Sequence, residues 1–181
     1  MEVRPEIQIR AMIKAMVDVV LPAVDPEQKM AQEQARLVIG TLGLIAGRLP
    51  VAYRFDRDQL DRYVSLSREL VALDRANGGG GQTLSRLESL AERGADVLKR
   101  ARAEPSELEF MVFDLRAEVS RLLQSIHNTA SPEKWAKVNK LILATSKLEL
   151  ERERALVVAM GFEPDPGSIS PIESLLPPVN V

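Results

Sequence analysis

The chain has 181 residues, of which 45% are hydrophobic and 28% are charged, as in ordinary globular proteins and unlike disordered chains. The net charge of -2 gives no field that would attract a polyanion, so bulk charge does not indicate a binder of nucleic acid or of anionic membranes. There is no cysteine, which excludes a disulfide framework and thiolate chemistry and fits a reducing compartment.

No segment resembles a signal peptide or a membrane span. Residues 1–5 contain an acidic residue and a proline and lead into an amphipathic segment, unlike a secretory signal. The longest run without a charged residue, residues 37–47, would rise only about 16 Å as a helix, far less than a bilayer core. We therefore expect a soluble, cytoplasmic protein that binds neither membranes nor nucleic acid.

Aromatic residues make up only 4% of the chain, so Leu, Ile, Val, Met and Ala must fill the core. This composition favours helices, because strand-rich proteins usually carry more Tyr, Phe, Trp and Thr. Periodicity and capping residues predict an all-α bundle of about six helices around a central apolar helix, with an extended Pro-rich C-terminal tail. The helices are expected at residues 5–21, 25–49, 56–76, 83–103, 106–128 and 131–160.

The first expected helix has a proline near each end. Pro5 suits the first helical turn, and Pro22 is expected to stop the helix because its ring clashes with the preceding turn. The apolar face between them comprises Ile9, Met12, Ile13, Met16 and Val20.

The second helix, which Asp25 is expected to cap, is predicted to lie at the centre of the bundle. Residues 37–47 carry no charge, and a helix that is apolar on all sides has to be covered on all sides. Gly40, Gly43 and Gly47 each cost about 1 kcal/mol of helix stability relative to Ala. They indicate the close approach of a neighbouring helix, and a ligand lying against the backbone is the alternative.

The third helix is expected to start at Asp56, which forms a D-x-x-Q capping box with Gln59. It ends at a Gly-rich loop, residues 77–82, because consecutive glycines lose too much entropy in a helix. This loop could separate two three-helix halves. We favour one domain over residues 1–161, since neither half has many residues to bury alone. No Lys-Ser or Lys-Thr follows the glycines, which excludes a P-loop.

The last three helices have clear start signals. Thr83 caps the fourth, Ser106 and Glu109 form a capping box for the fifth, and Ser131 precedes a proline at the start of the sixth. Gly94 lies on the apolar face of the fourth helix and predicts a close crossing with a neighbour.

Residues 162–181 contain five prolines and are not predicted to form a packed helix over most of their length. Their apolar residues are too numerous for a purely solvated tail. We expect this tail to dock on the bundle or on a partner, and Ser170 and Pro171 could begin a single helical turn.

The inventory of reactive residues is small. His127 is the only histidine, which excludes sites with several histidine ligands, and no G-x-S-x-G motif is present. His127 lies in the last turn of the fifth helix, where terminal carbonyls stabilise a cation, so a structural role is favoured over that of a general base. We predict no catalytic residue, no metal and no cofactor.

Three candidate ligand-binding residues lie around the connector that precedes the third helix. Arg48, Tyr53 and Arg54, with Arg57 nearby, could hold a phosphate or carboxylate through guanidinium groups. Arginines near loops are common, so a purely structural role is the competing interpretation.

Arg152 is the fourth candidate. It continues the inward-facing positions of the sixth helix and could clamp an anion, with Glu149 as a partner if it is buried. The alternative is a surface ladder of ion pairs within residues 149–154, which is the more common use of such a charged run.

The N-terminal part resembles an uncharacterised family of small all-helical bacterial proteins encoded beside aminoglycoside-phosphotransferase-like kinases and acyl-CoA dehydrogenases. The resemblance covers about the first 75 residues and depends on Arg4-Pro5, Val20-Leu21-Pro22-Ala23-Val24, Ala35 and Leu42-Gly43-Leu44-Ile45-Ala46-Gly47-Arg48-Leu49. The Arg-Glu pair expected at the end of the second helix is replaced here by Gly47-Arg48-Leu49-Pro50. The resemblance implies an accessory or partner protein linked to acyl-CoA metabolism.

These observations leave three functional hypotheses, in order of preference. The first is a non-enzymatic interaction or accessory module that binds a protein partner or forms a homo-oligomer through its tail and sixth helix. The second is a binding protein for a small apolar or acyl ligand held between helices, with an arginine at its acidic end. The third is an enzyme that acts without metal or cofactor.

Overall fold

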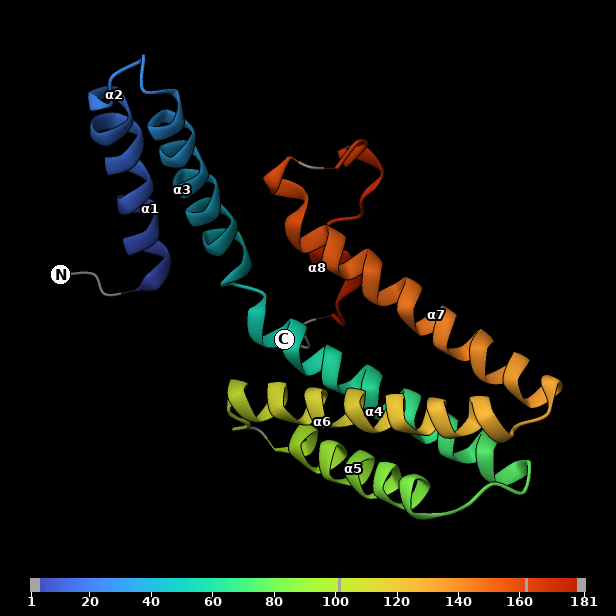
Figure 1. Ribbon diagram of the computed structural model, residues 1–181. Coiled ribbons are helices and arrows are strands. Elements are labelled where there is room, and N and C mark those ends of the chain that lie inside the picture. Colours follow the sequence, from blue (N-terminus) through green and yellow to red (C-terminus); the bar gives the residue numbers. More distant parts are fainter. Residues whose placement is uncertain (1–3, 101, 162, 179–181) are drawn as a thin grey trace. The chain divides into compact units, whose positions relative to one another are not determined.

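The computed structural model describes residues 4–100, 102–161 and 163–178, and every regular element in those ranges is helical (Figure 1). The prediction of an all-α protein is confirmed. The elements are α1 (Pro5–Ala15), the π-helix η1 (Met16–Val20), α2 (Leu21–Ala23), α3 (Lys29–Arg48), α4 (Ala52–Ala76), α5 (Gln82–Lys99), α6 (Pro105–Thr129), α7 (Pro132–Val157), the 3-10 helices η2 (Val158–Met160) and η3 (Pro166–Ser168), and α8 (Ile172–Leu175).

The chain divides into two compact units. The first contains the described residues of 1–52 and 151–178, and the second contains residues 53–150 apart from residue 101. This division differs from the single bundle expected over residues 1–161. It also does not follow the Gly-rich loop, residues 77–82, which lies inside the second unit.

The first unit begins with a helical hairpin in which α1, η1 and α2 run antiparallel to α3 (Figure 1). Contrary to expectation, Pro22 does not stop the first helix, which continues to Ala23. Proline has no N–H to give to the carbonyl four residues earlier, and its ring crowds that carbonyl. The π-helical stretch η1, in which the Leu21 N–H bonds to the Met16 carbonyl, widens the helix just before the proline and relieves both problems.

The second helix of the hairpin, α3, starts later than predicted. Asp25 does not cap it: the Asp25 carboxylate accepts a hydrogen bond from the Glu27 N–H at 2.9 Å and closes a separate turn. Gln32 then ties this turn to α3, because its Nε2 donates to the Val24 carbonyl at 2.7 Å. The helix itself begins at Lys29.

The expectation that residues 37–47 are covered on every side is wrong. Leu37 is 53% exposed and Val38 is 45% exposed, and Ala35 is the only residue of α3 that is fully buried. A methyl group added to Gly40 or Gly43 would meet no atom within 4 Å, and the same holds for Gly47, so no element of the structure approaches these glycines. The helix packs on α1 along one side and also contacts η2, and Leu37 and Val38 remain exposed.

The C-terminal residues complete the first unit. As predicted, the last long helix starts after Ser131, whose Oγ accepts a hydrogen bond from the Lys134 N–H, and stops at Gly161 with φ +78°. After η3 the chain forms α8, where Ile172 and Leu176 are buried. The predicted helical turn after Pro171 is therefore present. Residues 162 and 179–181 of the predicted tail lie outside the described residues.

The second unit has a conventional hydrophobic core formed by α4, α5, α6 and the N-terminal part of α7. Leu60, Leu87, Leu108 and Leu115 are fully buried there. A Cβ added to Gly94 would lie 2.8 Å from Val64 Cγ2 and 3.4 Å from Leu60 Cδ1. The predicted close crossing at Gly94 is thus confirmed, between α5 and α4.

Helix α4 is longer than predicted and ends in an ordered turn. It begins at Ala52, so Asp56 lies within the helix and forms no N-cap, because the connector after α3 is only three residues long. At its C-terminus the Gly79 N–H bonds to the Asp74 carbonyl and the Gly78 N–H to the Arg75 carbonyl, with Gly78 at φ +73°. This is a Schellman motif, so the Gly-rich loop starts as a helix cap.

No single described helix is long and apolar enough to cross a membrane. Helices α3 and α4 have that length and apolar composition only when they are taken together.

Candidate functional site

The four candidate ligand-binding residues belong to different parts of the molecule. Arg48 and Arg152 belong to the first unit, whereas Tyr53 and Arg54 belong to the second. The structure therefore does not establish them as one site, and each is described by its own surroundings.

Tyr53 and its neighbour Arg57 bind the backbone at the end of α5 and in the segment that follows it. The Tyr53 hydroxyl donates to the Ala103 carbonyl at 3.2 Å, and Arg57 donates to the carbonyls of Leu98 and Arg100. The last carbonyls of a helix have no partner within the helix, so Arg57 acts as a cap for α5. These donors stabilise the fold, which favours the structural interpretation. Arg54 lies half-buried in the first turn of α4.

Arg48 and Arg152 both lie in the part of the first unit that contains the end of α7. Arg48 Nε donates to the Leu156 carbonyl at 3.3 Å, just before α7 tightens into η2. Arg152 is 2% exposed, which excludes the surface ladder that the charged run favoured and leaves the inward-facing alternative. Glu149, the partner considered for it, bonds to Tyr63 of α4 and to Arg116 of α6 in the second unit.

The structure gathers a polar cluster that the sequence did not predict, formed by Tyr63, Arg116 and Glu149. Arg116 Nε donates to the Tyr63 hydroxyl oxygen at 2.8 Å, and that hydroxyl donates to Glu149 Oε2 at 3.0 Å. Arg116 also forms an ion pair with Glu149, and Gln59 Nε2 donates to the same carboxylate at 3.5 Å. Every charged group of the cluster is thus bonded to another member, and the cluster ties α4, α6 and α7 together.

Burial governs the proton affinity of this cluster. It raises the pKa of the Tyr63 phenol, and the negative charge of Glu149 acts in the same direction against the hydrogen bond from Arg116. The pKa of Arg116 is also raised, because its bonds to Tyr63 and Glu149 outweigh the effect of burial. Both groups therefore stay protonated throughout the neutral range, and the hydroxyl is not poised to act as a base.

The cluster lies in a shallow groove of about 260 Å³, whose walls include Leu66, Val119, Leu123 and Ile142. Glu149 was assigned to a solvated charged run, whereas it is 20% exposed and bonded. The neighbouring residue Leu148 is 48% exposed, so burial of Glu149 does not follow from burial of the residue before it.

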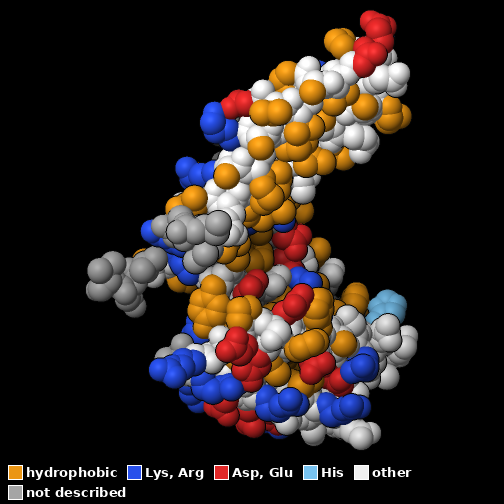
Figure 2. All heavy atoms as spheres, turned by 90° about the vertical axis from the view of Figure 1, so that its left-hand side faces the viewer, with side chains coloured by type: hydrophobic (Ala, Val, Ile, Leu, Met, Phe, Trp, Pro, Cys, Tyr) orange, Lys and Arg blue, Asp and Glu red, His pale blue; other side chains and the backbone are white. Residues whose placement is uncertain are grey.

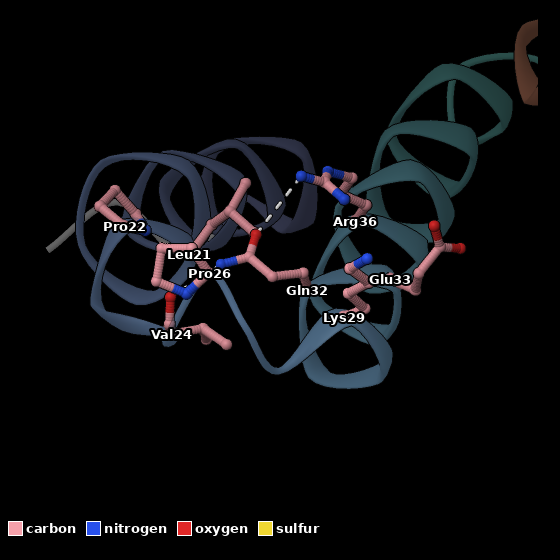
Figure 3. A pocket seen from close by; sticks show the side chains of 8 residues that line it. All are labelled: Leu21, Pro22, Val24, Pro26, Lys29, Gln32, Glu33 and Arg36. Atoms are coloured by element: carbon pink, nitrogen blue, oxygen red, sulfur yellow. Dashed lines mark hydrogen bonds between the residues drawn. The ribbon is translucent and has the colours of Figure 1, made fainter.

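A hollow of about 560 Å³ belongs to the first unit. It lies at the turn of the hairpin, with apolar residues on one side and Lys29 and Arg36 on the other (Figure 3). Gln32 lies between the two sides, accepting a hydrogen bond from Arg36 at 3.4 Å while it donates to Val24. The remaining lining residues are Leu21, Pro22, Pro26 and Glu33.

The most distinctive feature of the molecule is the apolar exterior of the hairpin. Nine large aliphatic side chains of α1, η1 and α3 are between 41% and 74% exposed. Figure 2 shows hydrophobic side chains along the hairpin, whereas charged side chains crowd the second unit. We call these nine residues the hairpin surface: Ile7, Met12, Val17, Val19, Val20, Met30, Leu37, Val38 and Ile45.

Comparison with known proteins adds no functional assignment. No protein-family model matches the chain, and no curated protein or solved structure matches it significantly.

Proposed function

We propose that this chain is a cytoplasmic, non-enzymatic interaction or accessory module, and that the hairpin surface is its binding element. The exposure of nine large aliphatic side chains on one two-helix element carries this proposal. Scattered exposed aliphatics are normal, but a concentration on one element is typical of an interaction site. The sequence had suggested the tail and the last long helix as the binding surface, whereas this proposal assigns binding to α1, η1 and α3.

The second unit supports the same proposal through the way it uses its polar groups. Tyr63, Arg116 and Glu149 are bonded to one another, and Tyr53 and Arg57 bond to backbone carbonyls. These are structural uses that hold helices together. They favour a stable scaffold that carries the hairpin.

The resemblance of the N-terminal part gives the first partners to test. It covers the whole hairpin, and the family it points to is encoded beside acyl-CoA dehydrogenases and phosphotransferase-like kinases. We therefore propose that the bound partner takes part in acyl-CoA-related metabolism.

Affinity capture with matched surface variants tests the proposal. Val38→Glu places a charge on the hairpin surface, and Leu143→Glu places the same charge on an exposed leucine of α7 in the second unit, where Leu143 is 61% exposed. We expect the purified chain and the Leu143→Glu variant to capture the same partner from the source cell, and Val38→Glu to lose it. Equal capture by all three proteins, or by none, would contradict the proposal.

A binding protein for a small apolar or acyl ligand is the second candidate function. The hollow at the hairpin turn supports it, because an apolar wall faces Lys29 and Arg36, the arrangement that an apolar molecule with an acidic group requires (Figure 3). Native mass spectrometry of the purified chain, and thermal shift with acyl-CoAs against an Arg36→Gln variant, test this function. Absence of both a retained ligand and an Arg36-dependent shift would contradict it.

A further inference from the structure

A second groove of the second unit lies between the N-terminal halves of α4 and α6 and has a volume of about 330 Å³. Among its lining residues, Leu108 and Val112 of α6 are buried and belong to the hydrophobic core of this unit. The groove therefore has a packed apolar base, on which the stem of a long side chain can lie.

Two carboxylates on different helices line this groove. Asp56 comes from α4 and Glu109 from α6, and neither side chain has a hydrogen-bonded or ion-paired partner in the part of the chain that the structure describes. Burial raises the pKa of Asp56, and the negative charge of Glu109 raises it further. Two like charges thus face one hollow, and a cation placed between them would relieve their repulsion.

The cations of this region bind other groups. Arg116 lines the same groove, but it bonds to the Tyr63 hydroxyl and forms an ion pair with Glu149. Arg57 donates to two backbone carbonyls at the end of α5. No lysine or arginine lies three or four residues from either groove carboxylate on its own helix, so no intrahelical pair neutralises them. The cation has to come from another molecule.

Exposed aromatic side chains lie at the groove and beside it. Phe113 lines the groove and is 53% exposed, and Phe110, one helical turn earlier, is 66% exposed. The chain has only four phenylalanines, so two exposed ones on one helix are a large share. Aromatic residues are enriched among the side chains that contribute most to protein–protein binding, and a guanidinium group stacks on an aromatic face.

We propose that the groove between α4 and α6 binds an arginine side chain of a partner protein, whose guanidinium group pairs with Asp56 and Glu109. The stem of this arginine lies on Val112, and the ring of Phe113 covers its planar end. Arginine fits better than lysine, because its rigid fork of five donors can bond to two separate carboxylates at once. The inference goes beyond the proposed function, since it does not involve the hairpin surface.

The competing explanation is that both carboxylates stabilise their own helices. Each lies just beyond the first helical turn, where a negative charge interacts favourably with the helix dipole. Removal of the charge would then lower the melting temperature. The proposal predicts the opposite, because two unpaired like charges at one groove cost stability that binding groups commonly cost. We expect Asp56→Asn and Glu109→Gln to raise the melting temperature at neutral pH, and Glu69→Gln, at an exposed position of α4, to leave it unchanged. A lower melting temperature in both groove variants would overturn the proposal.

An NMR titration of the full chain with a blocked leucine–arginine–leucine peptide tests binding directly. We expect saturable shifts of the backbone amide signals of Glu109 and Phe113. The same peptide with citrulline in place of arginine has nearly the same shape without the charge, and we expect it to bind about tenfold more weakly. Equal binding of the two peptides, or no binding of either, would overturn the proposal.

Matched variants show which residues hold the peptide. Asp56→Asn and Glu109→Gln should each weaken binding of the arginine peptide about tenfold, and Phe113→Ala should weaken it about threefold. Glu69→Gln should bind as the wild type does. The dispersion of the amide spectrum checks that each variant is folded. Unchanged affinity in both carboxylate variants would overturn the proposal.

The outcomes separate this inference from the proposed function. Val38→Glu alters the hairpin surface alone and should bind the arginine peptide as the wild type does. A chain that captures a partner through Val38 but binds no arginine peptide contradicts the inference and leaves the hairpin function standing. A chain that binds the peptide through Glu109 but captures no protein through the hairpin supports the inference and contradicts the hairpin function.

Discussion

In the second unit Leu60, Leu70 and Leu115 are fully buried, whereas in the hairpin of the first unit Leu37 is 53% exposed and Met30 is 74% exposed. Both regions have apolar residues at helical spacing. The difference is that the second unit stacks several helices around one core, while α1 and α3 have mainly each other. A helix that is apolar on several sides needs neighbours on several sides, and the contacts of α3 with α1 and η2 leave much of its apolar surface exposed.

The glycines show the same contrast at atomic scale. Gly94 in α5 lies so close to Val64 of α4 that no side chain fits without movement, whereas Gly40, Gly43 and Gly47 in α3 face open space. A glycine that is costly in a helix is explained in the second unit by a neighbour that is present. In the hairpin no neighbouring atom explains the glycines of α3, because a Cβ added to any of them would lie in open space.

The largest expected effect comes from truncating one leucine in each unit. Leu115→Ala should lower the free energy of unfolding by about 2–5 kcal/mol, because it leaves a cavity in a closed core. Leu37→Ala should change it by less than about 0.5 kcal/mol in dilute protein, because the side chain is exposed. Urea unfolding measures the free energy change of both variants. It is followed by circular dichroism and by the fluorescence of Trp135, which packs against the core of the second unit. A comparable cost for Leu37→Ala would mean that the hairpin is covered.

Glycine replacement in each unit should have effects of opposite sign. Gly94→Ala should destabilise the second unit by about 1–3 kcal/mol, because the new methyl group would lie 2.8 Å from Val64 Cγ2. Gly43→Ala should stabilise the hairpin by up to about 1 kcal/mol, since it adds helix propensity without a clash. Thermal unfolding of both variants measures the difference. Stabilisation by Gly94→Ala would contradict the close crossing of α5 and α4.

Removing one charge from the polar cluster of the second unit should have an intermediate effect. Glu149→Gln leaves Arg116 without its ion pair and should cost about 1–3 kcal/mol. Glu153→Gln, at an exposed position on the same helix, is the matched control and should stay within about 0.5 kcal/mol. Denaturant unfolding compares them. Equal effects would show that the cluster contributes nothing to the packing of α7.

The smallest expected effect is the pH dependence of stability that comes from Tyr63, a residue of the second unit. Burial raises the pKa of Tyr63, so the folded state holds the phenolic proton more tightly than the unfolded state does. The resulting stability is fully present below the ordinary tyrosine pKa of about 10 and is lost as pH rises through the higher folded value. Absorbance titration of a Tyr53→Phe variant, in which Tyr63 is the only tyrosine, should give the raised pKa. As pH rises above the pKa of Tyr63, the Tyr63→Phe variant should lose less stability than the wild type. A Tyr63 pKa at the ordinary tyrosine value would contradict burial of the phenol in the cluster.

Local signals predicted both ends of the last long helix and one close helix crossing. Ser131 and Gly161 bound the last long helix as expected, and Gly94 marks a close crossing. The caps predicted at Thr83 and Ser106 are absent, because α5 begins at Gln82 and α6 at Pro105, and neither N-cap residue forms a side-chain hydrogen bond. The predictions at Pro22, Asp25 and Asp56 were also wrong. A π-helical turn accommodates the proline, a separate turn uses the first aspartate, and a short connector places the second inside α4. In each case the backbone had more than one way to satisfy its hydrogen bonds.

The candidate ligand-binding residues were predictable only as inward or outward positions. The charged run around Arg152 favoured a surface ladder, but Arg152 is buried, and Glu149 of the same run bonds to Tyr63 and Arg116 on other helices. The partner of a buried charge depends on which helices lie beside it. Spacing along one helix carries no information on that point.

The sequence by itself determined that the chain is helical, where most helices end, and that residues 37–47 are uncharged on every face. These properties follow from composition, capping and periodicity, which act over a few residues. Only the tertiary structure decided that the chain forms two units, that the polar cluster assembles across three helices, and that the uncharged segment stays open. The burial of a helix depends on how many other elements pack against it. Apolar periodicity indicates which face should be covered, but it does not indicate which element of the chain covers it.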